Sequence, residues 1–518
     1  MPEFDSATLT RQMMFGLSPD LNSWIYNGLD CCVTAEIYES LMSDLAHEPE
    51  NVRSIYQFTL DKSAAFFEMS LRGIRVDPEA KASTIAMLES QIAALQSRFR
   101  LLTTELFGYP ISPTSPPQVK SLFYEILSIN PIKKRNSKGI YAPTVDESAL
   151  EKLRFNFWAE PFINYILAIR TLSKKLSFLR TGIDADGRIR TSLNIAGTNT
   201  GRLASSASDF GTGTNLQNVD TALRYPFVSD PGMLFVNVDL EQADARNVAA
   251  IIHNMFYGEP GYDTYLNACE SGDTHTTVCK LSFPELDWPE DPKNWKSFCD
   301  SIIFHGQDSY RQAAKKLGHG TNYYGQPRQM AVQTHVPEKV VAAFQKKYFG
   351  AFPLIKRWQD ETIRLIRTTG ELTTIYGRRR HFFGRGDAAE TWRQAIAYAP
   401  QSMTGHQIDS GILNLWRNLP QAELLIQVHD SILFQVPFAE HETLVPEALR
   451  LLHFPFELKG GRVFSVPLEA KTGWNWGNRN EDKKTKEVTN PWGLAKWTGK
   501  DSRQPPKQPP RSIKRLIG

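Results

Sequence analysis

The sequence lacks three features that would each define a class of protein. It has no uncharged apolar run of about 18 residues, which a membrane-spanning helix would need. Its opening MPEFDSATLT contains two acids and no apolar core, so we expect no secretory signal. Its five cysteines form no C-x-x-C pair, which disfavours a disulfide scaffold and a four-cysteine zinc site. We therefore expect a protein of a reducing, cytoplasmic compartment, neither secreted nor in a membrane.

A large net charge is also lacking. The chain has 59 Lys and Arg against 56 Asp and Glu, so its composition alone does not indicate nucleic-acid binding. With 518 residues, 41% of them hydrophobic and 22% charged, it is typical of a globular chain of about three domains. Positive charge and proline are concentrated in residues 479–518. This segment is predicted to be a flexible basic tail, either a solubilising terminus or a contact for nucleic acid or a partner.

One long helix is predicted over residues 78–107. Asp77 is a suitable N-cap, Pro78 suits the first helical position, and Gly108 can end the helix. Apolar side chains recur at spacings of three and four, which predicts one apolar face packed into a core rather than a dimerising zipper. They are Ile85, Leu88, Ile92, Leu95, Phe99, Leu102 and Leu106.

Short apolar runs rich in β-formers predict strands at residues 233–238, 424–428 and 432–436. The last two flank the sequence His-Asp-Ser at 429–431 and are predicted to form a hairpin. Most of the chain between the first strand and this hairpin has a helical pattern. The fold class is therefore α+β: a helical lobe, a small antiparallel sheet, and a helical insertion between its strands.

Two acids and one basic segment indicate the chemistry. Asp239 and Asp430 each lie at a strand end, and two carboxylates brought together there can hold a hard cation such as Mg²⁺. The segment RQAAKKLGHGTNYYG lies between them and spaces four side chains so that they share one helical face. These are Arg311, Lys315, His319 and Tyr323. Cations attract phosphates and an aromatic ring can stack on a base, so this face is interpreted as a nucleotide contact.

These three segments resemble motifs A, B and C of the family A DNA polymerases, the group of DNA polymerase I and several phage replicases. Other blocks are similar to the family's segments in the same order, so that the resemblance runs from about residue 20 to 475. They are FEMSLRGIRVD (67–77), ISPTSPPQVKSLFYEIL (111–127), TNTGRLASS (198–206), NLQN (215–218), GDTHT (272–276), IYGRRRHFFGR (375–385) and AYAPQSMTG (397–405).

The resemblance implies a right-hand fold with an antiparallel palm sheet and mostly helical thumb and fingers. The implied boundaries are an exonuclease-like remnant at 1–58, thumb and connection at 59–190, palm at 191–260 (motif A), fingers at 261–370 (motif B), palm at 371–478 (motif C), and the flexible basic tail at 479–518. The implied function is extension of a primer 3′ end on a DNA template with dNTPs, by two-metal-ion nucleotidyl transfer in viral or phage replication.

The resemblance also implies a role for each matching residue. Asp239 and Asp430 would bind two Mg²⁺ ions, with the Leu240 carbonyl as a backbone ligand, and Lys315 would protonate the leaving pyrophosphate. The nucleotide-binding set would be Arg311, Lys315, His319, Tyr323, His275, Asp244 and Gln242. The DNA-binding set would be Arg202, Asn215, Gln217, Arg246, Gln401 and His429.

The sequence departs from the family pattern at several of these positions. Asp244 stands where the family usually has a Glu that excludes a ribose 2′-hydroxyl, and His319 replaces the usual Phe or Tyr. Ser431 follows Asp430 where the DNA polymerases usually carry Glu, and single-subunit RNA polymerases resemble this variant. Sugar selection is therefore the property that these departures bring into question.

Of the proofreading domain, only the third motif has a counterpart. WIYNGLDCCVTAEIY places Tyr26 and Asp30 as that motif does, and no acidic D-x-E pair precedes them. We therefore expect no intrinsic proofreading, and a separate exonuclease or processivity subunit is a candidate partner besides primer-template DNA and dNTPs. The motif B sequence is more similar to phage enzymes, in which case the location would be the host cytoplasm.

Two other interpretations stay open. Ser431 and the short Asp244 favour a single-subunit RNA polymerase, although TGRL and NLQN resemble the DNA enzymes. An inactive, DNA-binding replisome subunit is the third interpretation. Against it, both acids and both cations, Arg311 and Lys315, are present.

Overall fold

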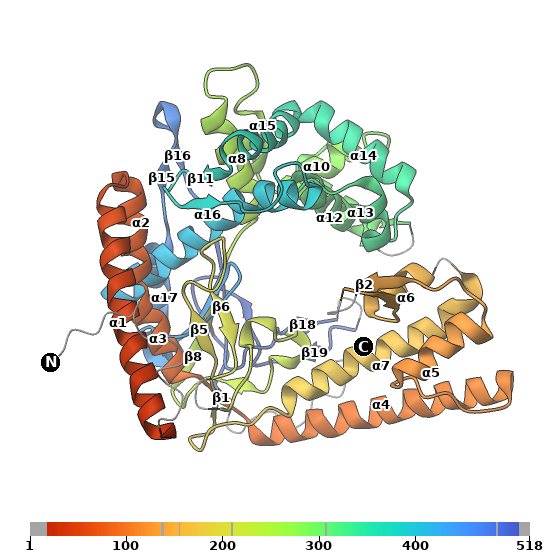
Figure 1. The fold of residues 1–518 in the computed structure, drawn as a ribbon. Helices are drawn as coiled ribbons and strands as arrows, with labels where there is room; N and C mark the ends of the chain where they lie inside the picture. The colour runs from red at the N-terminus through yellow and green to blue at the C-terminus, as the bar shows by residue number, and fades with distance from the viewer. Residues whose placement is uncertain are drawn as a thin grey trace. The chain divides into compact units, whose positions relative to one another are not determined.

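The computed structural model describes residues 18–135, 139–154, 156–208, 211–305, 308–482 and 485–506 (Figure 1). The chain divides into two compact units, one of Met1–Asp61 with Thr373–Arg379, the other of Lys62–Leu372 with Arg380–Gly518. Among the described residues, no helix combines the length and apolar character needed to cross a membrane. The larger unit contains both predicted acids and the basic segment between them.

The smaller unit is built on two helices, α1 (Pro19–Ala46) and α2 (Glu50–Asp61). The whole of α1 is described, and none of its side chains is buried. Tyr26 is 60% exposed, and Asp30 is exposed on the same helix. The two residues that resemble an exonuclease motif therefore both lie on an exposed helix.

In the larger unit, α4 occupies Pro78–Phe107, as predicted for the long helix. The Asp77 carboxylate accepts hydrogen bonds from the amides of Glu79 and Ala80, both at 3.0 Å. Gly108 ends the helix in the left-handed conformation, with φ of 78°, which glycine adopts without strain.

The predicted apolar face of α4 is correct except at its carboxyl end. Leu88 and Phe99 are fully buried, whereas Leu106 is 58% exposed. The neighbouring Phe107 packs instead, with its ring 5.8 Å from that of Phe162 on α7 (Glu160–Leu179). Helices α4 and α7 lie side by side along much of their length (Figure 1).

The other elements that precede the central sheet in the chain are short. Among the helices they are α3 (Ser63–Arg72), α5 (Pro116–Ser121), η2 (Leu122–Ile126), α6 (Glu147–Leu153), η3 (Phe157–Ala159), η4 (Leu216–Asn218) and η5 (Thr221–Leu223). The strands are β1 (Ile74–Val76), β2 (Lys133–Arg135), β3 (Tyr141–Pro143), β4 (Arg188–Ile189), β5 (Ser192–Asn194), β6 (Ala204–Ser206) and β7 (Phe227–Val228).

A five-stranded antiparallel sheet forms the centre of the larger unit. Its spatial order is β13-β14-β8-β17-β20. The strands are β8 (Met233–Leu240), β13 (Glu423–Val428), β14 (Ser431–Pro437), β17 (Leu468–Gly473) and β20 (Ala495–Lys496). The strand from residue 233 and the hairpin around residues 429–430 are thus confirmed. Because β8 is flanked on both sides and almost continuously buried, its residues are held in a fixed register.

The predicted helical insertion is also confirmed. Between β8 and β13 lie α8 (Ala243–Met255), α9 (Thr264–Glu270), α10 (Thr274–Ser282), η6 (Pro292–Asn294), α11 (Trp295–Ser301), β9 (Ile303–Phe304), β10 (Asp308–Ser309), α12 (Tyr310–Asn322), α13 (Pro327–Thr334), α14 (Glu338–Ala351), α15 (Pro353–Thr369), β11 (Glu371–Thr373), β12 (Arg379–His381) and α16 (Ala389–Asn418). Beyond β14 follow η7 (Phe438–Glu440), α17 (His441–Leu452), β15 (Phe456–Glu457), η8 (Lys459–Gly461), β16 (Val463–Phe464), β18 (Asn480–Glu481) and β19 (Val488–Thr489).

The prediction of a flexible basic tail from residue 479 is wrong for the described part of that segment. Strand β20 extends the central sheet by pairing with β17. Arg503 then fixes the chain, donating hydrogen bonds to the Thr472 carbonyl at 2.7 Å and to buried Asp501 at 2.6 Å. Charge counting missed this because backbone pairing and one buried ion pair do not depend on the net charge of a segment. Residues 507–518 lie outside the described residues.

Candidate active site

The register of the central sheet brings the two predicted acids together. Asp239 on β8 is directly opposite Ser431 on β14 and Glu469 on β17. Asp430 lies in the turn between β13 and β14, where His429 has a positive φ of 57°. The Asp430 carbonyl accepts a hydrogen bond from the Leu240 amide at 3.0 Å, which joins the turn to the end of β8.

Both carboxylates are short of compensating charge. Burial, and then the nearby Asp430 and Glu469, raise the pKa of Asp239, although Lys471 opposes them. Burial and Asp244 raise the pKa of Asp430, against the effects of Arg202 and His429. Asn237 holds Asp239 in place with a hydrogen bond to its carboxylate at 2.9 Å. Two partly buried carboxylates with raised pKa values form a site that a bound cation would stabilise.

The donor set fits Mg²⁺ in its chemistry. Asp239, Asp430 and the Leu240 carbonyl offer oxygen ligands only, and Mg²⁺ is commonly held by one or two carboxylates together with substrate phosphates. Within the described ranges, no group of three or more His, Cys, Asp or Glu side chains is placed to hold a metal. The protein would therefore supply a partial ligand set, which a phosphate-bearing substrate and water would complete.

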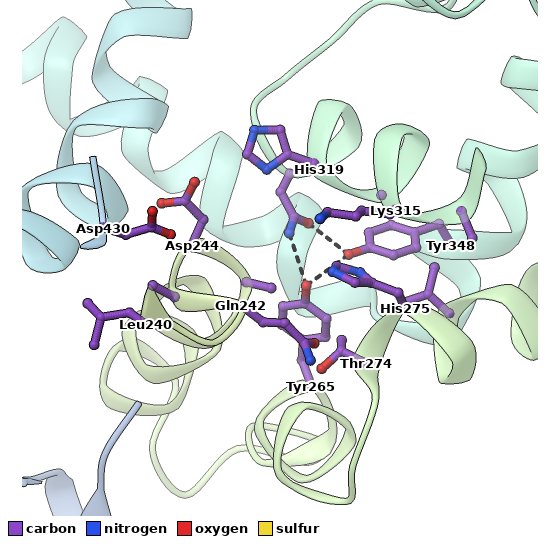
Figure 2. A pocket seen from close by; sticks show the side chains of 16 residues that line it. Leu240, Gln242, Asp244, Tyr265, Thr274, His275, Lys315, His319, Tyr348 and Asp430 are labelled. Carbon is purple, nitrogen blue, oxygen red and sulfur yellow. Dashed lines mark hydrogen bonds between the residues drawn. The ribbon is translucent and has the colours of Figure 1, made fainter. Parts of the chain in front are cut away.

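A cavity of about 300 Å³ opens beside Asp430 (Figure 2). Seven of the predicted residues line it, and Figure 2 shows Asp430 and Asp244 toward one end, with Lys315 and His275 toward the other. The predicted lining residues are Leu240, Gln242, Asp244, His275, Lys315, His319 and Asp430. The cavity thus has an acidic end supplied by the sheet and the start of α8, and a basic end supplied by α10 and α12.

Two residues of the predicted face of α12 lie at the cavity, as their spacing of four residues predicts. Lys315 and His319 both line the cavity, while Tyr323 ends the helix with its ring 4.7 Å from that of His319. Burial and nearby Lys315 lower the pKa of His319. His319 is therefore a neutral aromatic wall at neutral pH rather than a second cation.

Arg311, the first residue of the predicted face, does not line the cavity. Its guanidinium donates a hydrogen bond to Asp273 at 2.5 Å and lies 3.9 Å from Asp300. Asp273 caps α10 and accepts a hydrogen bond from Thr276 at 2.7 Å. Burial opposes ionisation of Asp273, but the hydrogen bonds from Arg311 and Thr276 lower its pKa overall. In this structure Arg311 therefore supports the start of α10 instead of presenting its charge to the cavity.

The start of α10 carries His275 into the cavity. Burial, together with the charges of Lys315 and Arg311, lowers the pKa of His275 to about 4, although Asp273 opposes the shift. A neutral imidazole can donate one hydrogen bond and accept another. His275 is thus suited to a hydrogen bond with a phosphate oxygen, not to an ion pair.

Asp244 is tied to the segment that resembles the template-primer block. Its carboxylate accepts hydrogen bonds from Arg202 at 3.4 Å and from Thr404 at 3.3 Å. Arg202 also donates to the Gln401 carbonyl at 3.1 Å. Burial and the Asp244 charge raise the pKa of Tyr323 well above 10. Asp244 therefore lies between the turn with Asp430 and the end of α12.

The predicted DNA contacts have mixed positions. Gln217 donates to the Gln427 carbonyl at 3.2 Å, and Gln427 in turn donates to the His429 carbonyl, which connects this residue to the Asp430 turn. The Asn215 side-chain oxygen is buried without a partner among the described residues. Arg246 is only 5% exposed and lies inside the helical insertion, so its predicted contact with DNA stays a prediction.

Sequence reasoning missed a hydrogen-bonded group at the basic end of the cavity. Tyr348 donates to Asn322 at 2.9 Å, and Asn322 donates to the Tyr265 hydroxyl at 3.0 Å (Figure 2). Thr274 also lines the cavity. Asn322 is seven positions after Lys315, close to the same helix face. This spacing was the one sign in the sequence that the hydrogen-bonded group belongs to the site. The two tyrosines come from α9 and α14, which only the fold brings together.

These features together define a site in which acids from a sheet turn and from the start of α8 meet Lys315 of α12 and His275 of α10 at one cavity, in an α+β fold, with Asp239 on the adjacent strand β8. A family model described as DNA polymerase family A matches residues 82–257 and 301–478. The chain belongs to DNA polymerase family A.

Individual relatives agree with this assignment. The chain is 27% identical over 432 residues to the thermostable DNA polymerase I of Thermus filiformis, covering 79% of this chain and 46% of that protein. It is 26% identical over 494 residues to the DNA polymerase I of Chloroflexus aurantiacus, covering 90% and 48%. It therefore spans about half the length of the curated relatives that it matches.

A solved structure supports the fold. The POL domain of Pol1 from M. smegmatis, in complex with a DNA primer-template and dNTP, superposes with a TM-score of 0.63 over 80% of this chain and 69% of that one. The sequence identity is 21%, so this likeness concerns the fold alone.

Proposed function

We propose that this chain is a DNA-templated DNA polymerase that extends a primer 3′ end with dNTPs. The observation that carries the proposal is the single cavity at which Asp430 and Asp244 approach from one end and Lys315 and His275 from the other. A nucleoside triphosphate has two parts that a protein can recognise. One is the sugar beside the reacting phosphate, and the other is the polyanionic phosphate tail. The two ends of the cavity are complementary to these.

The phosphate tail would lie at the basic end. Lys315 has the charge and the position on α12 to contact it, and its ammonium can donate a proton to the departing pyrophosphate. Neutral His275 and the hydroxyl of Thr274 would orient the phosphate oxygens. Arg311 would act through α10, because its contact with Asp273 fixes the helix start that carries these two residues.

The reacting groups would lie at the acidic end. Asp239 and Asp430 would hold Mg²⁺, with the Leu240 carbonyl as a further ligand. When bound there, Mg²⁺ supplies the positive charge that favours ionisation of the primer hydroxyl and offsets charge on the phosphate. Since burial already raises the pKa of both carboxylates, their charge is unfavourable until a cation neutralises it. The acidic end would therefore favour a divalent ion.

Asp244 would select the sugar. Its carboxylate is held by Arg202 and Thr404 beside the cavity, so a ribose 2′-hydroxyl would meet a fixed group rather than a mobile one. His319 would pack against the incoming nucleoside, because it is a neutral ring on the same cavity.

The larger architecture follows the same proposal. Residues 59–190 would be the thumb and connection, residues 191–260 and 371–478 the palm, and residues 261–370 the fingers. Primer-template DNA would be the partner of all three. A replication enzyme without its own proofreading is the specific form that we propose, since Tyr26 and Asp30 lie exposed on α1. The similarity of the motif B sequence to phage enzymes is the reason for proposing a phage type.

A primer-extension assay tests this function against its alternatives. The purified chain with Mg²⁺ is expected to extend a DNA primer on a DNA template with dNTPs, and to use rNTPs poorly. Preferential use of rNTPs, or synthesis without a primer, would instead support the RNA polymerase interpretation that Ser431 suggests. DNA binding without extension under any nucleotide or metal condition would support an inactive replisome subunit.

A further inference from the structure

One aromatic side chain outside the cavity is left uncovered. Phe383 is 97% exposed, more than any other large apolar side chain in the described part of the chain. It lies in the loop of residues 382–388, between β12 and α16. Leaving a phenylalanine in water forgoes the free energy that burial of its ring would contribute. A function that covers the ring for part of the time would explain why it is placed there.

The backbone on either side of Phe383 is held in place. The Phe382 amide donates to the Gly370 carbonyl at 2.8 Å, and its buried ring belongs to a cluster with Ile366 and Tyr398. At the other end of the loop, the Trp392 indole donates to the Gly386 carbonyl at 2.8 Å. Phe383 is therefore presented by an anchored loop, so that ordering it on a ligand would have a small entropic cost.

The loop also carries one exposed cation. Arg385 is 84% exposed, and its ion partner Asp387, at 3.3 Å, is itself 65% exposed, so this pair is weak. A Cβ on Gly386 would lie 3.7 Å from the Cα of Arg367, an exposed residue at the end of α15. Two exposed guanidinium groups thus come from adjacent backbone segments. An aromatic ring beside cations is the combination that binds single-stranded nucleic acid by base stacking and phosphate contact.

The loop is connected to the end of α12. The ring of Trp392, which fixes the loop, is 6.4 Å from that of Tyr324. Tyr324 follows Tyr323, the C-cap of the helix that carries Lys315 and His319. A strand that leaves the cavity past the end of α12 would therefore reach the loop after passing these aromatic residues.

We infer that Phe383 and Arg385 form a stacking site for a base of the single-stranded template that has not yet been copied. Phe383 would stack on the base, and Arg385, supported by Arg367, would contact the adjoining phosphate. The inference rests on the proposed function, because it assumes a templated polymerase whose uncopied strand leaves the cavity past the end of α12.

The test compares two primer-templates that differ only in a 5′ template overhang of a few nucleotides. Fluorescence anisotropy gives the Kd of each without dNTP, and the ratio of the two measures what the overhang contributes. Phe383→Ala is expected to reduce that ratio by about tenfold and to leave the blunt duplex unaffected, since stacking contributes roughly 1–3 kcal/mol per base. Phe383→Trp should retain it.

A matched control is available in Phe157, which is 84% exposed in η3, a segment remote in sequence from the loop. Phe157→Ala should leave the overhang ratio unchanged. Arg385→Ala should weaken binding of the overhang and reduce the slope of log Kd against log salt by roughly 0.7. An equal loss on both duplexes, or no loss on either, would overturn the inference.

Two further outcomes separate this inference from neighbouring ones. If the wild-type chain self-associates in light scattering and Phe383→Ala makes it monomeric, the ring is a protein contact and the stacking site is wrong. If the wild type fails to extend primers but still shows the Phe383-dependent overhang ratio, the proposed function fails while the binding site stands.

Discussion

The acidic and basic ends of the cavity are built in different ways. The acidic end comes from Asp430, in a tight turn of the sheet, and from Asp244 on α8, and the hydrogen-bonded register of the same sheet fixes Asp239 on β8 relative to that turn. The basic end comes from helices α10 and α12, whose side chains are positioned by ion pairs and packing. The comparison teaches that the sheet supplies a rigid centre for chemistry, and that the helices supply groups whose positions depend on one another.

Because the acidic end would hold the metal ligands, substitutions there are expected to cause the largest loss of primer extension. Asp239→Ala or Asp430→Ala is expected to reduce primer extension on the order of 10³-fold or more, because the metal ligands would be incomplete. Binding of primed template should change little, since duplex affinity comes mainly from phosphate contacts. Steady-state extension and anisotropy measure the two quantities, with exposed Asp360→Ala as a control. Near-normal turnover in either variant would refute the metal assignment.

Removing the cation of the basic end should have the next largest effect. Lys315→Ala is expected to lower kcat and raise KM for dNTPs, with kcat/KM falling roughly 10²-fold. The adjacent Lys316 is 52% exposed and pairs with Asp308, so Lys316→Ala is a matched control that should keep wild-type kinetics. A change confined to primed-template affinity would instead place Lys315 in the duplex-binding surface.

Asp244 lies at the acidic end beside Asp430, and its loss should alter selectivity more than rate. Asp244→Ala is expected to increase rNTP relative to dNTP incorporation by roughly tenfold, because a fixed side chain would no longer oppose the 2′-hydroxyl. Single-nucleotide incorporation kinetics measure the ratio. Asp244→Glu should restore or improve discrimination, and unchanged discrimination in the alanine variant would show that another residue selects the sugar.

The Arg311–Asp273 pair tests how the basic end is held together, through its contribution to the free energy of unfolding. Breaking it with Asp273→Ala is expected to lower the free energy of unfolding by about 1–3 kcal/mol, because both groups are mostly buried. A double-mutant cycle with Arg311→Ala should show coupling. Because the folded-state pKa of Asp273 is below its unfolded value near 4, the stabilisation should be present above about pH 4 and be lost as the pH falls further. Additive single effects would mean that the pair does not support α10.

The smallest effect is expected at the exposed helix α1. A two-metal exonuclease needs several converging carboxylates, and Asp30 is exposed on this helix. The purified chain should therefore leave a mismatched primer 3′ end undegraded, and Asp30→Ala should change nothing. Mg²⁺-dependent degradation that Asp30→Ala abolishes would contradict this. Degradation that appears only after a second protein is added would indicate a split arrangement.

The sequence predicted best the features whose causes are local. The ends of α4 follow from Asp77 and Gly108, and the hairpin around Asp430 follows from two apolar runs separated by a turn. The meeting of Asp239 and Asp430 could be anticipated only through the family resemblance, since pairing of β8 with β14 joins residues far apart in the chain.

The failures have a common physical cause in distant partners. Arg311 has the spacing of a cavity residue, but Asp273 draws its guanidinium to the start of α10. Arg246 was predicted to contact DNA and is buried. The segment after residue 479 has the composition of a flexible tail, yet β20 and the Arg503–Asp501 pair fold it onto the sheet. For Arg311 and for this segment, the deciding contact is made by a residue that local patterns do not identify.

The central claim is that one site has an acidic and a basic end. Its most direct test measures dNTP binding in a complex that cannot carry out nucleotidyl transfer. A primer that ends in a 3′-deoxynucleotide holds the complex before transfer, and the Kd of the correct dNTP is then measured over a range of Mg²⁺ concentrations. The account predicts that wild-type affinity rises with Mg²⁺, that Asp239→Ala removes this dependence, and that Lys315→Ala weakens binding at every Mg²⁺ concentration. Unchanged Mg²⁺ dependence in Asp239→Ala, together with unchanged affinity in Lys315→Ala, would contradict it.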